Sequence, residues 1–91
     1  APYQATLTGE FNCMPHLTAT GPEAEVCVWG IKTDVGEWYA LDIPESLYTG
    51  MLERSYARIT VTGIMTPIEQ ISSDQWKDFP AEGVMQVERF E

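Results

Sequence analysis

The sequence has little positive charge. Its 91 residues include five lysines and arginines against fourteen aspartates and glutamates, which gives a formal net charge of −9 at pH 7. Binding to nucleic-acid backbones without regard to sequence needs clustered lysine and arginine side chains, so this class of function is disfavoured. Attachment to an anionic membrane surface is disfavoured for the same reason. The acidic charge predicts a neutral or basic partner, or a cation.

Long hydrophobic runs are also absent. A helix that spans a bilayer needs about 20 apolar residues, whereas the longest apolar run covers residues 26–31. We therefore expect no insertion into a membrane. The length suits one compact domain and the chain shows no linker, so residues 1–91 are predicted to form a single domain.

Cysteine is limited to Cys13 and Cys27. An even count in a small chain favours a disulfide and an oxidising compartment, and a bridge closing a loop of about 15 residues would contribute roughly 3 kcal/mol. The alternative is two buried free thiols. The chain starts at Ala1, which fits either a trimmed chain or removal of a targeting segment from an exported protein. We expect a periplasmic or secreted location.

Alternation of apolar and polar residues predicts strands, and the turn Asp34-Val35-Gly36 predicts a hairpin with a positive φ at its glycine. The predicted strands are residues 3–13, 26–33, 37–43, 58–65 and 84–90. Residues 44–55 are the single helical candidate, shortened to about two turns by Gly50. Proline, glycine and serine predict loops at residues 14–25 and 66–83.

An internal repeat indicates the fold class. Residues 6–9 and 60–63 share the pattern Thr, aliphatic, Thr, Gly. A glycine inside a strand often marks a bulge or sharp bend, which small closed barrels need. Five strands with a helix between the third and fourth is the element order of the OB-fold. We therefore predict an all-β protein, a five-stranded OB-fold-like barrel with one short helix between strands 3 and 4.

A set of short motifs extends over residues 7–87. The motifs are Cys13-Met14-Pro15-His16, Gly21-Pro22, Cys27, Tyr39-Ala40-Leu41-Asp42 and Thr66-Pro67-Ile68-Glu69. This pattern resembles that of small exported bacterial proteins of OB type. The resemblance implies the fold and export, and it supplies no catalytic or cofactor-binding residues. Periplasmic OB-fold stress proteins and copper chaperones are similar to the chain only in architecture.

Four side chains could bind a soft metal: Cys13, Met14, His16 and Cys27. They suit Cu(I), or Zn(II) if the thiols are free. No second Cys-x-x-Cys or histidine pair completes the set, and a disulfide would consume both thiols. The favoured interpretation is therefore that the cysteines pair while His16 forms hydrogen bonds within its loop. A periplasmic soft-metal carrier is kept as an alternative function.

Catalysis has weak support. His16 is the single histidine, and no serine lies in a Gly-x-Ser-x-Gly motif. The carboxylate pairs Glu23 with Glu25 and Asp74 with Asp78 could in principle serve acid–base chemistry, but a solvated face explains them better. We expect no enzymatic activity and no cofactor.

The alternation of inward and outward side chains along the strands suggests a binding surface. It places Trp29 and Ile31 inside the barrel and Trp38 outside, close to Val28, on the strands where OB-folds commonly bind extended ligands. An exposed tryptophan can stack on a sugar or pack in a protein interface, whereas stacking of nucleic acid would need a positive groove. The alternative is that Trp38 is covered by Trp76 and the loop around it.

The resulting hypothesis is a non-enzymatic, exported binding module. It would bind a protein or another ligand, not nucleic acid, through the outer face of the second and third predicted strands. Val28 and Trp38 would form the apolar centre of this face, with Lys32 and Asp42 as polar neighbours. A further alternative is an accessory subunit of a larger extracytoplasmic assembly.

Overall fold

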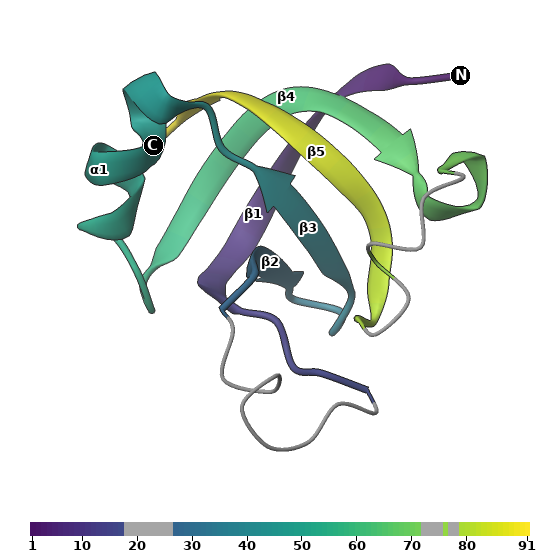
Figure 1. Cartoon of the computed structure of the whole chain (residues 1–91). Helices are drawn as coiled ribbons and strands as arrows, with labels where there is room; N and C mark the ends of the chain where they lie inside the picture. The colour runs from purple at the N-terminus through teal and green to yellow at the C-terminus, as the bar shows by residue number, and fades with distance from the viewer. Residues whose placement is uncertain (18–26, 72–75, 77–78) are drawn as a thin grey trace.

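The computed structural model describes residues 1–17, 27–71, 76 and 79–91. The elements in this part of the chain are, in order, β1 (Tyr3–Cys13), β2 (Trp29–Thr33), β3 (Trp38–Asp42), α1 (Glu45–Leu52), β4 (Arg58–Pro67), the 3-10 helix η2 (Ile68–Gln70) and β5 (Ala81–Phe90) (Figure 1). The predicted 14–25 loop is described only as far as residue 17. The predicted strand start at Val26 and both carboxylate pairs lie outside the described residues.

The five strands close into a barrel in the order β1-β2-β3-β5-β4. All neighbours are antiparallel except β3 and β5, which run parallel. Helix α1 connects β3 to β4 (Figure 1). This is the predicted OB-fold-like barrel, with its short helix between strands 3 and 4.

One face of each strand fills the barrel. The inward side chains and one helical residue form the core: Phe11, Ile31, Leu41, Met51, Ile59, Val61, Met65, Met85 and Val87. The alternation seen in the sequence for β1 and β4 is thereby confirmed. Met51 is the buried residue of α1, which is eight residues long. No helix in the described ranges is long and apolar enough to cross a bilayer.

The predicted hairpin joins β2 to β3. Thr33 N–H donates to the Glu37 carbonyl at 2.8 Å, and Gly36 N–H donates to the Thr33 carbonyl at 2.9 Å. Gly36 has φ +85°. The three-residue turn 34–36 is therefore confirmed, with glycine at the position of positive φ.

The two repeated segments pair with each other. Leu7 on β1 lies opposite Val61 on β4, so the pattern Thr, aliphatic, Thr, Gly meets its own copy in antiparallel order. The hydroxyls of the flanking threonines form cross-strand hydrogen bonds, at 3.2 Å between Thr6 and Thr62 and at 2.9 Å between Thr8 and Thr60. The outer face of these two strands is therefore a small polar patch.

Each repeat ends at a glycine that pairs with a strand on both sides. Gly9 pairs with Ile59 on β4 and with Thr33 on β2. Gly63 pairs with β1 and, after a shift of register, with Val87 on β5. The predicted bends are thus the points at which β1 and β4 coil from one side of the barrel to the next.

The last strand is longer than predicted. It begins at Ala81 rather than at residue 84, because Ala81 pairs with Trp38 on β3 and Gly83 pairs with Pro67 on β4. Both Ala81 and Gly83 are buried. The strand-breaking composition of the predicted 66–83 loop is overridden here by pairing with two neighbouring strands.

Candidate functional site

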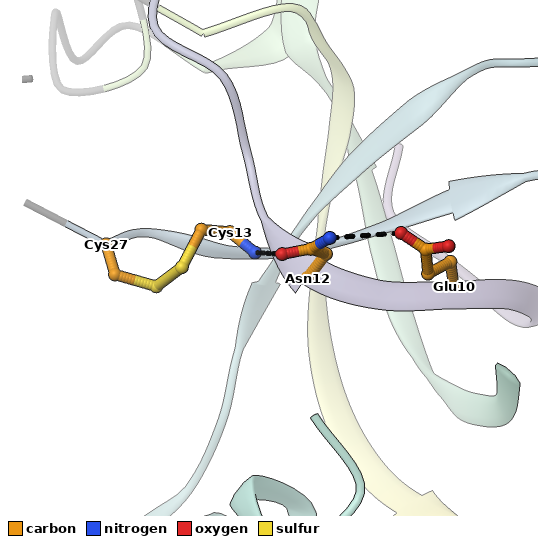
Figure 2. Close-up of a disulfide and its surroundings, with 4 residues drawn as sticks. All are labelled: Glu10, Asn12, Cys13 and Cys27. Atoms are coloured by element: carbon orange, nitrogen blue, oxygen red, sulfur yellow. Dashed lines mark hydrogen bonds between the residues drawn. A yellow bond between two sulfur atoms is a disulfide. The ribbon is translucent and has the colours of Figure 1, made fainter. Parts of the chain in front are cut away.

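Cys13 and Cys27 form a disulfide, as predicted (Figure 2). Their Cα atoms lie 5.2 Å apart, at the end of β1 and just before β2. The side chain of Asn12 supports this end of the strand: its Oδ1 accepts from Cys13 N–H at 2.7 Å, and its Nδ2 donates to Glu10 Oε1 at 3.0 Å. The alternative of two free thiols is wrong for this structure.

The other candidate metal ligands pack against neighbouring side chains. Met14 is 3% exposed and belongs to a buried cluster outside the barrel. The imidazole of His16 packs against Phe79 with ring centroids 4.7 Å apart. Over the described ranges, no group of three or more histidine, cysteine, aspartate or glutamate residues is arranged to hold a metal ion. With both sulfurs in a disulfide, the predicted ligand set has lost its two thiolates.

Some residues of the predicted binding face pack against other side chains, and the others are exposed to solvent. Trp29 and Ile31 pack inside the barrel, as strand parity predicts. Val28 and Trp38 lie on the outer side but are half-buried. Lys32 and Asp42 are exposed.

A second hydrophobic cluster accounts for this burial. Its buried members are Met14, Ala40 and Ala81, and its half-buried members are Val28, Trp38, Trp76, Phe79 and Val84. The cluster covers the outer side of β3 with side chains from the segments before β2 and before β5. This arrangement corresponds to the alternative in which Trp38 is covered, so much of the predicted apolar centre is used for internal packing.

A pocket lies beside this cluster, over the outer side of β3, β5 and β4. Its volume is about 260 Å³, and it is lined by Asp42, Ile64, Thr66, Ile71, Val84 and Gln86. The strand register explains the arrangement. Asp42 pairs with Gln86 and Gln86 with Ile64 in one row, while Val84 pairs with Thr66 in the adjacent row.

The polar side chains of the pocket are not used elsewhere in the described part of the chain. No side-chain hydrogen bond or ion pair ties Asp42, Gln86 or Thr66 to another described residue. Ile71, which follows η2, adds an aliphatic wall to those of Ile64 and Val84. The pocket thus combines unpaired oxygen acceptors with an apolar surface.

Sequence reasoning identified one lining residue, Asp42, and missed the others. A signal was present on each strand. Ile64 is an aliphatic residue on the face of β4 that otherwise carries Arg58 and threonines, and Val84 stands between Glu82 and Gln86 on the polar face of β5. An aliphatic side chain on the solvent face of two strands indicates a surface that contacts something else.

Three groups with shifted pKa values in the described part of the chain lie away from the pocket. Hydrogen bonds from Arg58 lower the pKa of Asp34, and the same contact raises the pKa of Arg58. Burial raises the pKa of Tyr39, and the neighbouring carboxylate of Glu37 adds to the shift. These groups lie at the β2–β3 turn and beside it, and none of them lines the pocket.

Comparison of the chain with protein-family models, with curated proteins and with solved structures found no match.

Proposed function

We propose that the protein is a non-enzymatic binding module whose ligand occupies the pocket over β3, β5 and β4. One observation carries the proposal: three polar side chains that bond to no other described side chain stand beside three aliphatic ones in a single hollow. Binding sites typically combine an apolar lining with a few polar groups that fix the orientation of the ligand. Here Asp42, Gln86 and Thr66 are those polar groups.

The chemistry of the lining favours binding over catalysis. Asp42 is the single ionisable group among the described residues that line the pocket. Glycoside hydrolysis, for example, uses two carboxylates that flank the scissile bond. A lone carboxylate is better suited to orienting a ligand.

The location we propose is outside the cytoplasm, in the periplasm or secreted. The Cys13–Cys27 disulfide supports this, because structural disulfides form and persist in oxidising compartments. The resemblance to small exported bacterial proteins of OB type points the same way. The net charge of −9 favours neutral or basic partners over nucleic acid.

The proposed site adjoins the surface expected from the sequence. Both include the outer side of β3, and Asp42 belongs to both. The site extends over β5 and β4 rather than over β2, because Trp38 and Val28 pack into the second cluster.

A fragment screen tests this proposal without assuming a ligand. The ¹⁵N-labelled protein would be titrated with a mixed set of small cationic, anionic and neutral compounds, and amide shifts would be followed by NMR. We expect the shifts to concentrate at residues 64–66, 84–86 and Asp42. A Gln86→Trp variant would fill the middle of the pocket and remove these shifts.

The matched control is Thr8→Trp, which adds the same side chain to the outer face of β1, away from the pocket. It should leave the shifts unchanged. Thermal unfolding would confirm that both variants are folded. Fragments that bind elsewhere, or that bind equally well to Gln86→Trp, would overturn the proposal.

A further inference from the structure

We infer that the pocket binds a primary ammonium group on an aliphatic stem, and specifically a lysine side chain presented by a protein partner. This inference rests on the proposed function, because it names the chemistry that the same pocket selects. The charge of the pocket, the order of its side chains and its exposure support it.

The charge of the pocket selects a cation. Asp42 supplies a carboxylate, and no lysine or arginine is among the described lining residues to neutralise it. Gln86 and Thr66 add an amide and a hydroxyl oxygen from the neighbouring strands. An ammonium group has three donors and no acceptor, so beside Asp42 it can donate to the carboxylate and to the amide oxygen of the neighbouring Gln86. The acidic net charge attracts such a ligand from a distance.

The order of the side chains places the charge at one side and the aliphatic surface at the other. Asp42, Gln86 and Ile64 stand in one row across β3, β5 and β4. Neighbouring strands lie about 4.8 Å apart, so the row spans roughly 10 Å from Asp42 to Ile64. An ammonium group at Asp42 would direct its stem across Gln86 towards Ile64 and Ile71.

A lysine fits this lining better than an arginine. The guanidinium group is planar, and it is favoured where a carboxylate is contacted by two parallel donors or where an aromatic face allows stacking. The described lining has no aromatic side chain. The two neighbouring acceptors, Asp42 and Gln86, come from adjacent strands, an arrangement that suits the compact ammonium group with donors that rotate freely.

The exposure of the pocket points to a side chain on a macromolecule rather than a free amine. Asp42 and Gln86 are exposed, and Ile64, Thr66, Ile71 and Val84 are half-buried. Sites for small free ligands usually enclose most of the ligand surface. An open hollow on the outer side of a barrel is instead accessible to a side chain that projects from another protein.

The test uses capped amino acids as probes in an NMR titration of the whole chain. Nα-acetyl-lysine N-methylamide carries the ammonium group, the norleucine analogue has the stem without the charge, and the arginine analogue has the other cation. We expect the lysine probe to shift the amides of Asp42, Ile64, Val84 and Gln86, with an affinity about tenfold above that of either comparator.

Two variants assign the effect to the carboxylate of the pocket. Asp42→Asn removes one negative charge with almost no change in size, and it should abolish the preference for lysine over norleucine. Glu10→Gln removes the same charge from β1, away from the pocket, and it retains an oxygen that can accept from Asn12. The preference should persist in Glu10→Gln.

A last comparison distinguishes the source of the ammonium group. A capped Gly-Gly-Lys-Gly-Gly peptide should bind more tightly than n-pentylamine, and the reverse order would overturn the assignment to a protein partner. Tighter binding of arginine would overturn the choice of ammonium. If screening fragments bind in the pocket while the lysine probe does not, this inference fails and the proposed function stands. If neither binds, both fail.

Discussion

Gly9 and Gly63 face the same steric restriction in two paired strands. A Cβ atom on Gly9 would overlap the carbonyl oxygen of Lys32 on β2, and a Cβ atom on Gly63 would overlap the carbonyl oxygen of Gln86 on β5. In both cases the obstacle is backbone, which cannot move aside as a flexible side chain can. The two glycines therefore allow each long strand to approach its second neighbour closely.

We predict that Gly9→Ala and Gly63→Ala each lower the free energy of unfolding strongly. Overpacking typically costs about 1–3 kcal/mol, and the upper part of that range is expected because the clash is with backbone atoms. Urea unfolding followed by tryptophan fluorescence measures the change. The control is Gly36→Asn, because no atom lies within 4 Å of a Cβ there and asparagine tolerates its φ of +85°. Equal losses in all three variants would contradict the steric argument.

Reduction of the Cys13–Cys27 disulfide should lower the free energy of unfolding by about 3 kcal/mol, the value for a loop of this size. The comparison is between the oxidised protein, the same protein in a phosphine reductant, and the Cys13→Ser/Cys27→Ser double variant. The last two should agree. A loss well below 1 kcal/mol would mean that the loop is already restrained without the covalent bond.

The contact between Asp34 and Arg58 predicts a defined dependence on pH. Arg58 Nη2 donates to Asp34 Oδ2 at 2.8 Å, and Nη1 donates to Oδ1 at 2.5 Å. Mainly through these hydrogen bonds, the folded-state pKa of Asp34 lies below its ordinary value of 3.8. A depressed carboxyl pKa contributes stability that is present above pH 3.8 and is lost as the pH falls through the folded-state value.

A ¹³C NMR titration of the Asp34 carboxyl should therefore have its midpoint below 3.8. Arg58→Gln should move the midpoint upward, and 1 M salt should move it in the same direction because both side chains are largely exposed. A midpoint that does not respond to Arg58→Gln would show that another group causes the shift.

The second hydrophobic cluster predicts that Trp38 contributes to stability. Truncation of a buried tryptophan costs about 3–5 kcal/mol, so we expect Trp38→Ala to cost about 2 kcal/mol from its half-buried position. Lys32→Ala is the matched control, since Lys32 pairs with Trp38 on β2 and is exposed. It should change stability by less than about 0.5 kcal/mol. If Trp38→Ala left the stability unchanged, Trp38 would not be part of the packing, and it would belong to the predicted binding face.

The elements that depend on residues close together in the sequence could be predicted from it. The alternation in residues 3–13 and 58–65 identified β1 and β4, and the turn 34–36 identified the hairpin. The repeated glycines indicated the bends because glycine tolerates the close approach of backbone. The disulfide followed from the even number of cysteines.

The pocket depends on contacts that are distant in the sequence. Asp42 and Gln86 become neighbours only through the parallel pairing of β3 with β5. No local pattern specifies that pairing or its register. For the same reason the burial of Trp38 could be posed only as an alternative, because its partners in the second cluster include Ala81 and Phe79 from the far end of the chain.

The strand order also determines when the chain can fold. Tyr3 pairs with Met65, so the first strand cannot complete its ladder with β4 until about two thirds of the chain is present. The barrel then closes only when the ten residues of β5 lie between β3 and β4. Native contacts of such long sequence separation slow folding. The β1–β2–β3 meander and its disulfide can form early, but the closed core must wait until β5 pairs with both β3 and β4.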